Sequence, residues 1–147
     1  MVVRRERVVP APPAEVWRVV SDPHRLAAWW PGVSRVEEAS REAWTTVLVS
    51  KTGKSVRADY TLVAAEEPER VQWRHEVEAS PFERLLHEST TEIALAPEAS
   101  GGTKVRVTLD QRPRGWARFS PFQLWAAARR QAEAALDGLT ELFGDAR

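Results

Sequence analysis

The hydrophobic pattern opens with one strand and two short helices. Val2–Val9 begins with β-branched residues and stops at a proline-rich stretch, which predicts a strand. A helix is expected over Ala14–Ser21, because the prolines just before it suit a first helical turn. Ser21-Asp22-Pro23 repeats that start signal and predicts a second short helix from about Pro23 to Trp30.

From Val33 to Arg112 apolar and polar residues alternate with a period of two, so this half of the chain predicts strands. Turn-forming segments of only a few residues separate them, which makes neighbouring strands antiparallel. One sheet face is therefore buried and the other solvated. The predicted strands are Val33–Ala39, Ala43–Ser50, Ser55–Ala65, Arg70–Glu78, Phe82–Ala96 and Thr103–Arg112.

A long helix ends the pattern. Ser120-Pro121-Phe122-Gln123 combines an N-cap, a proline at the first helical position and a capping-box glutamine, and Gly144 supplies a stop. At 1.5 Å per residue the helix measures roughly 35 Å, enough to cross a sheet. Its expected inward stripe, at steps of three and four residues, is Phe122, Trp125, Arg129, Ala132, Leu136, Leu139 and Phe143. The fold class predicted from this order is α+β.

Composition removes several functional classes. The 147 residues suit one domain, 1–147, and 21 basic against 21 acidic side chains argue against a nucleic-acid partner. Without cysteine there is no thiolate nucleophile, disulfide or sulfur-ligated zinc. No phosphate loop or other cofactor motif is present, so no cofactor is expected. No apolar run is long enough for stable membrane insertion, and no signal peptide is visible, so a cytoplasmic location is expected.

Aromatic composition is more informative than charge. Seven tryptophans stand against a single tyrosine, Tyr60. So many bulky apolar rings predict either a thick core or a cavity with aromatic walls.

Three stretches resemble one known family. Val9-Pro10-Ala11-Pro12-Pro13-Ala14-Glu15-Val16-Trp17, followed by Ser21-Asp22-Pro23, is similar to the opening signature of the START-like SRPBCC superfamily. Leu26-Ala27-Ala28-Trp29-Trp30-Pro31-Gly32-Val33 resembles the second-helix segment of its polyketide cyclase/dehydrase and lipid-transport branch, and Gly101-Gly102-Thr103-Lys104-Val105 its last hairpin. The resemblance implies a helix-grip fold, in which a seven-stranded antiparallel sheet curves around the C-terminal helix and leaves a cavity between them. It also implies ligands such as lipids, polyketides and aromatic metabolites.

Two histidines are the leading candidates for chemistry. If Pro81 is the centre of its hairpin, His75 faces His87 and Trp73 faces Ser89, all on the apolar face. Directly opposed residues have Cβ atoms roughly 4.5–5.5 Å apart, so the imidazoles could share a ligand or act as a general base. A buried pair satisfied by its neighbours is the alternative. A metal site is not expected, because no third ligand is evident.

Other polar groups on the expected apolar face allow two interpretations each. Tyr60 either binds a ligand or acts as an acid through its hydroxyl, or it sits at a rim with the hydroxyl in water. Arg129 either extends to an edge or meets an acidic ligand group.

The expected mouth of the cavity combines Trp30 and Phe122, with Trp73, His75 and His87 deeper inside. Trp125 is expected in the interior, so that Trp125→Ala should cost far more stability than Trp30→Ala.

The function these residues favour is a soluble binding protein that encloses a hydrophobic or aromatic small molecule. The alternative is a polyketide cyclase or dehydratase that uses His75, His87 and Tyr60 as acid–base groups, and a third is a regulatory partner protein. Residues 66–92 carry eight acids and three bases, whereas residues 112–130 carry five arginines and no acid. These are either solvated faces or complementary surfaces of a homodimer.

Overall fold

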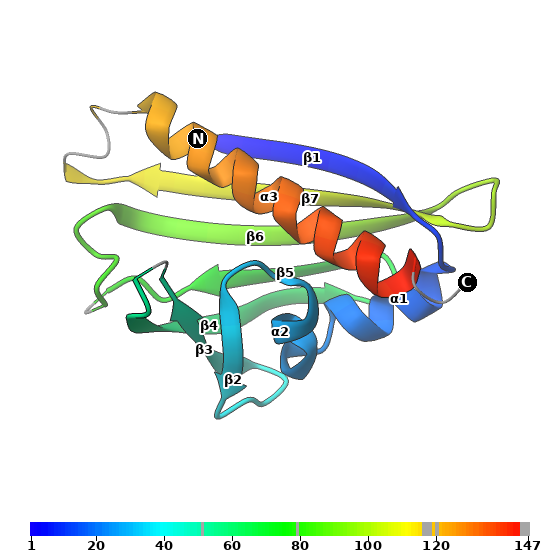
Figure 1. The fold of residues 1–147 in the computed structure, drawn as a ribbon, viewed down its shortest axis with the longest axis horizontal. Helices are drawn as coiled ribbons and strands as arrows, with labels where there is room; N and C mark the ends of the chain where they lie inside the picture. The colour runs from blue at the N-terminus through cyan, green and yellow to red at the C-terminus, as the bar shows by residue number, and fades with distance from the viewer. Residues whose placement is uncertain (51, 79, 116–118, 120, 145–147) are drawn as a thin grey trace.

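A computed structural model describes residues 1–50, 52–78, 80–115, 119 and 121–144, and in this part of the chain seven strands form one antiparallel sheet (Figure 1). The strands are β1 (Val2–Val9), β2 (Val33–Glu37), β3 (Ala43–Val49), β4 (Ser55–Glu66), β5 (Arg70–His75), β6 (Leu86–Pro97) and β7 (Thr103–Pro113). The helical segments are α1 (Pro13–Val20), the 3-10 turn η1 (Pro23–Arg25), α2 (Leu26–Trp29) and α3 (Pro121–Gly144). The predicted α+β helix-grip fold is confirmed.

The sheet is a meander with one strand added at its edge. Its order is β1-β7-β6-β5-β4-β3-β2, so each strand from β2 to β7 pairs with its neighbour in sequence and β1 pairs with β7. Along β7, Thr103, Val105, Val107 and Leu109 are buried while Lys104 and Arg106 are exposed, which is the predicted alternation. Helix α3 lies diagonally across the buried face (Figure 1).

The second predicted helix is shorter than its sequence range. It consists of η1, whose backbone His24 N–H donates to the Asp22 side chain, and the single turn α2. Trp30 N–H still donates to Leu26 O, but Trp30 itself is extended, because the residue before a proline is disfavoured in helical conformation.

Helix α3 buries a narrower stripe than predicted. Ala128, Ala132, Ala135, Leu136 and Leu139 are buried against the sheet and α2. Two of the expected inward positions at the start of the helix are wrong, because Phe122 is 74% exposed and Arg129 is exposed; Trp125 is half-buried and packs against the core. The predicted cap at Ser120 lies outside the described residues.

The hairpin between β5 and β6 differs from its prediction. β5 ends at His75 and β6 begins at Leu86, so the connecting segment is longer than a turn centred on Pro81. Successive backbone hydrogen bonds, Ser80 N–H to Val77 O and Leu86 N–H to Phe82 O among them, hold that segment in turns. The register moves by two residues, and Trp73 pairs with Thr91 instead of Ser89.

This shift overturns the predicted pairing of His75 with His87. A β-bulge between Leu86 and Glu88 turns Leu86 inward, and the His87 side chain is exposed. His75 remains on the buried face because a shift of two residues preserves the side of the sheet on which each residue lies.

Candidate ligand cavity

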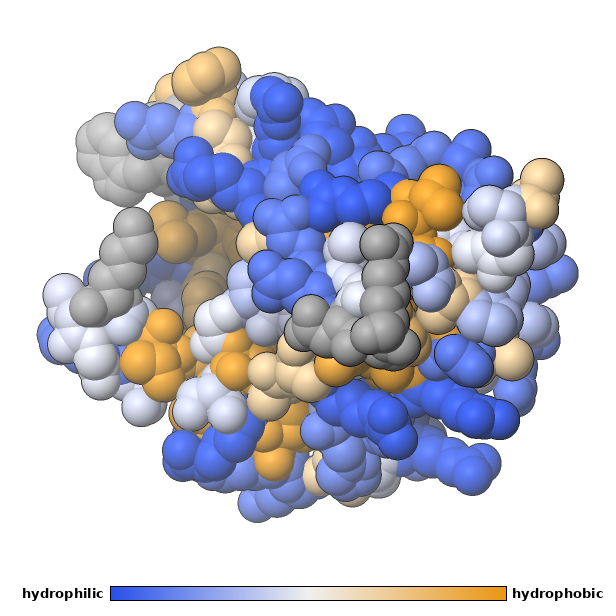
Figure 2. Space-filling view, turned by 45° about the vertical axis from the view of Figure 1, so that its right-hand side comes forward, coloured by the Kyte–Doolittle hydropathy of each residue, from blue (hydrophilic) through white to orange (hydrophobic). Residues whose placement is uncertain are grey.

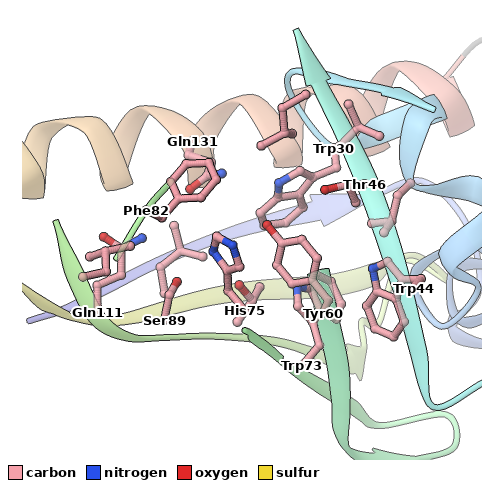
Figure 3. A pocket seen from close by; sticks show the side chains of 16 residues that line it. Trp30, Trp44, Thr46, Tyr60, Trp73, His75, Phe82, Ser89, Gln111 and Gln131 are labelled. Atoms are coloured by element: carbon pink, nitrogen blue, oxygen red, sulfur yellow. The ribbon is translucent and has the colours of Figure 1, made fainter. Parts of the chain in front are cut away.

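The buried face of the sheet contains a cavity of about 160 Å³. Strands β2 to β7 form its floor and walls, and residues of the α2 and α3 segments cover it (Figure 3). The space-filling view shows the molecule hollowed at its left side, with apolar residues at depth (Figure 2). The lining residues are Leu26, Trp30, Val33, Trp44, Thr46, Leu48, Tyr60, Trp73, His75, Phe82, Leu86, Ser89, Thr91, Leu109, Gln111 and Gln131.

Tryptophans form one end of this cavity. Trp73 lies between Trp30 and Trp44, with ring centroids 5.7 and 6.0 Å away and edge-to-face geometry in both contacts. Trp30 also contacts Trp29 edge-to-face, at 5.3 Å. Such pairs stabilise by about 0.5–1.5 kcal/mol beyond the area they bury. The aromatic wall is therefore part of the hydrophobic core.

Tyr60 and His75 form a stacked pair in the middle of the cavity. They are directly opposed on β4 and β5, and their rings lie 4.8 Å apart at an interplanar angle of 25°. Trp44 stacks against Tyr60 at 6.1 Å, and Phe82 meets the His75 ring edge-to-face at 4.8 Å. Both polar rings are thus held in place by aromatic neighbours, and Figure 3 shows them projecting into the cavity.

The surroundings keep both rings neutral at physiological pH. Burial lowers the pKa of His75 below 6.5, although the Asp59 and Glu76 carboxylates act in the opposite direction. Burial raises the pKa of Tyr60 to about 12, against the effect of a hydrogen bond with Thr46. The cavity therefore offers a phenol donor and an uncharged imidazole.

His75 has an uncommitted ring nitrogen. It is 6% exposed, and its Nε2 atom is buried without a hydrogen-bond partner among the described residues. A buried polar atom left unpaired costs about 1–3 kcal/mol, so a bound polar group or a water molecule would satisfy it. Among the described residues, the indole Nε1 of Trp44, which also lines the cavity, is buried and unpaired in the same way.

The end of the cavity opposite the tryptophans is polar but uncharged. Ser89, Gln111 and Gln131 lie there, on β6, β7 and α3 (Figure 3). No Asp, Glu, Lys or Arg lines the cavity in the part of the chain that the structure describes. The same part contains no cluster of three or more metal-ligating side chains.

The structure separates the predicted site residues into two groups. Trp30, Tyr60, Trp73, His75 and Ser89 all line the cavity. The remaining candidates do not: His87 lies exposed at the bulge, and Phe122, Trp125 and Arg129 line a separate groove along α3, with the Arg129 guanidinium 5.4 Å from the Trp125 ring.

Trp30 was expected at the mouth, but it is only 8% exposed and belongs to the core. That part of the prediction is wrong because α2 packs directly onto α3, which carries Trp29 and Trp30 inward.

Several lining residues were missed from the sequence. Thr46 and Gln111 continue the inward alternation of Trp44 and of Leu109, so the period of two could have found them. Gln131 follows Ala128 by three residues on the buried side of α3. Phe82 carried no usable signal, because it comes from the turns that replaced the predicted strand.

Comparison with protein families identifies the family to which the chain belongs. The family described as polyketide cyclase / dehydrase and lipid transport matches residues 1–144. The chain belongs to this family. This membership agrees with the resemblance of the sequence to the polyketide cyclase/dehydrase and lipid-transport branch of the START-like SRPBCC superfamily.

Solved structures show the same fold at low identity. A START superfamily protein from Mycobacterium smegmatis has a TM-score of 0.79 and 13% identity, covering 99% of each chain. A protein from Thermus thermophilus has a TM-score of 0.78 and 24% identity, again over 99% of each chain. One from Chromobacterium violaceum has a TM-score of 0.75 and 20% identity, over 97% of this chain and 96% of that one.

Such likeness establishes the fold, whereas family membership suggests ligand binding without naming the ligand. A comparison with proteins of curated function finds no significant match. None of the helices in the described ranges combines the length and the apolar character needed to cross a bilayer.

Proposed function

We propose that the protein binds a small hydrophobic or aromatic molecule in the cavity between the sheet and α3. The observation that carries this proposal is the buried, unpartnered Nε2 of His75 inside a tryptophan-walled cavity. A polar ligand group would satisfy this atom and remove the cost of leaving it unpaired.

The volume supports a ligand the size of one ring. About 160 Å³ is close to the engineered cavity of about 150 Å³ that holds benzene, and well below the roughly 300 Å³ at which drug-sized pockets begin. A fused-ring polyketide is therefore a poorer fit to the cavity itself than a single aromatic ring with one polar group.

The lining supports a neutral ligand. A carboxylate placed beside Trp73 and His75 would lose its hydration without gaining a counter-ion, since no lining residue among those described is cationic at neutral pH. Hydroxyl, carbonyl or amide groups pair with the neutral donors and acceptors that are present.

Calorimetric titration tests this function. We expect saturable binding of 4-methylphenol, indole or acetophenone at pH 7, and at least tenfold weaker binding of 4-methylbenzoate, which has similar size but carries a charge. Ser89→Phe should abolish binding by filling the cavity, whereas Thr90→Phe, on the same strand but facing away, should bind as wild type does. Failure of all three neutral compounds to bind, or equal binding by the two variants, contradicts the proposal.

The stacked Tyr60–His75 pair favours a second candidate, a cyclase or dehydratase. Neutral His75 would accept a proton from a carbon next to a ketone, and Tyr60 would donate a hydrogen bond to the developing enolate oxygen. His87 takes no part in this version, because its side chain is exposed.

A poly-β-ketone mimic the size of a triketide would serve as the test substrate. His75→Gln should lower kcat by about 10²–10⁴-fold, while the exposed His87→Gln leaves it unchanged. Turnover that survives His75→Gln would exclude this mechanism.

A further inference from the structure

An apolar groove lies beside the cavity on the surface of the molecule. It has a volume of about 500 Å³ and runs between α3 and two loop segments. Pro31 and Leu85 form one side, and Leu124, Ala127 and Ala128 form the helical side. Arg130 is its one charged lining residue within the described part of the chain.

Cavity and groove adjoin each other. Leu86, Gln111 and Gln131 line both of them, so these three side chains form the boundary between the two spaces. A molecule that fills the cavity and passes between these side chains would enter the groove.

The boundary carries hydrogen-bonding groups that nothing in the described chain uses. The side-chain amides of Gln111 and Gln131 are half-buried and make no hydrogen bond to a described residue, and the unpartnered Nε2 of His75 lies in the same cavity. Amide N–H groups here would donate to an acceptor oxygen without adding charge.

We propose that the ligand is a neutral aromatic carbonyl compound with an apolar chain. Its ring occupies the tryptophan end of the cavity, its carbonyl oxygen accepts from the boundary amides of Gln111 and Gln131, and its chain lies in the groove along Leu124 and Ala127. This inference rests on the proposed function and assigns it a ligand class.

Alkyl benzoates with methyl, butyl and hexyl chains test the groove, with binding measured by calorimetry at pH 7. In the wild type each added methylene should strengthen binding by roughly two- to fourfold, as expected for burial of a CH₂ group. Ala127→Arg places a charge in the groove and should weaken hexyl benzoate at least tenfold while changing methyl benzoate less than twofold. Ala126→Arg, one residue away on the same helix and outside the groove, is the matched control and should change neither ligand.

The affinities for toluene and for methyl benzoate, compared in wild type and variant, test the role of the boundary amides. Gln131→Leu should weaken methyl benzoate three- to tenfold and leave toluene unchanged.

The possible results separate the two proposals. If 4-methylphenol binds but methyl benzoate does not, or if chain length has no effect, the ligand class is wrong while the binding function stands. Equal effects of Ala126→Arg and Ala127→Arg would also overturn the assignment of the groove. If no neutral ring compound binds, the proposed function fails as well.

Discussion

Gly138 provides a direct test of how α2 is fixed against α3. A Cβ atom added at Gly138 would lie 2.2 Å from the backbone oxygen of Trp29, whereas real Cβ contacts are essentially never below 3.0 Å. In Gly138→Ala the two helices must therefore separate by at least 0.8 Å. Because backbone cannot rotate away as a side chain can, the cost should reach the upper end of overpacking penalties, about 3 kcal/mol.

The same substitution also favours the helix. Alanine is better than glycine in a helix interior by about 1 kcal/mol, so we expect a net loss of about 2 kcal/mol in the free energy of unfolding. For a chain of this length that corresponds to a fall in Tm of roughly 4–8 °C. Binding of 4-methylphenol should weaken too, since Trp30 follows Trp29 when α2 moves.

Urea unfolding followed by tryptophan fluorescence measures this change. Gly144→Ala is the control, because it makes the same substitution in the same helix where a Cβ would meet nothing within 4 Å. We expect it to change the free energy of unfolding by less than about 0.5 kcal/mol. Equal stability of the two variants would refute the close approach of α2 and α3.

Three further predictions concern the cavity and the helix beside it. Trp30→Ala should cost roughly 3–5 kcal/mol in urea unfolding, and Trp125→Ala less than half as much, because Trp30 is buried and Trp125 is not; the reverse order would place Trp125 in the core. Tyr60 is the single tyrosine, and an absorbance titration should show it ionising near pH 12. The stability that its raised pKa contributes below pH 10 is therefore lost as pH rises from 10 through 12. Ionisation near pH 10 in the folded protein would show that its hydroxyl is solvated. Because the pKa of His75 is lower in the folded protein, this histidine is protonated in the unfolded chain before it is protonated in the folded one. The free energy of unfolding should therefore fall as pH drops through 6.5, by at most about 1.4 kcal/mol per pH unit. Parallel plots of stability against pH for His75→Gln and wild type would contradict this.

Most of the fold follows from local signals in the sequence. Alternation locates the strands within a few residues, and proline and glycine mark nearly every boundary. The exception is the β5–β6 hairpin, where Pro81 indicates a turn but not its length. Backbone turns, among them the one closed by the bond from Leu86 N–H to Phe82 O, lengthen the connection, and the alternation of apolar and polar residues carries no signal of them.

The candidate site was predicted less completely than the fold. Period-two alternation places Trp73, His75 and Ser89 on the correct face, and it does so despite the wrong register. The alternation predicts the wrong face for His87, because a β-bulge between Leu86 and Glu88 interrupts the period of two. The prediction for the start of α3 is wrong for another reason. A periodic stripe shows which side of a helix is apolar, but it does not show where along the helix the sheet ceases to cover that side.

Charge patterns were informative about the chain itself rather than about a partner. Arg112 pairs with Glu88 at 3.6 Å and Arg114 with Glu83 at 3.8 Å, so the arginine-rich and acidic segments meet within one molecule. The homodimer built on their complementarity stays a prediction.

The turns between β5 and β6 form a segment whose sequence can change independently of the sheet. They supply Phe82 to the cavity wall but no pair to the β5–β6 ladder, which ends before them. Substitutions there would alter the shape that a ligand meets while leaving strand pairing and most of the buried tryptophan contacts intact. Natural selection could therefore vary ligand preference in this segment at little risk to folding, and a library randomised at positions 80–85 offers an engineer the same freedom.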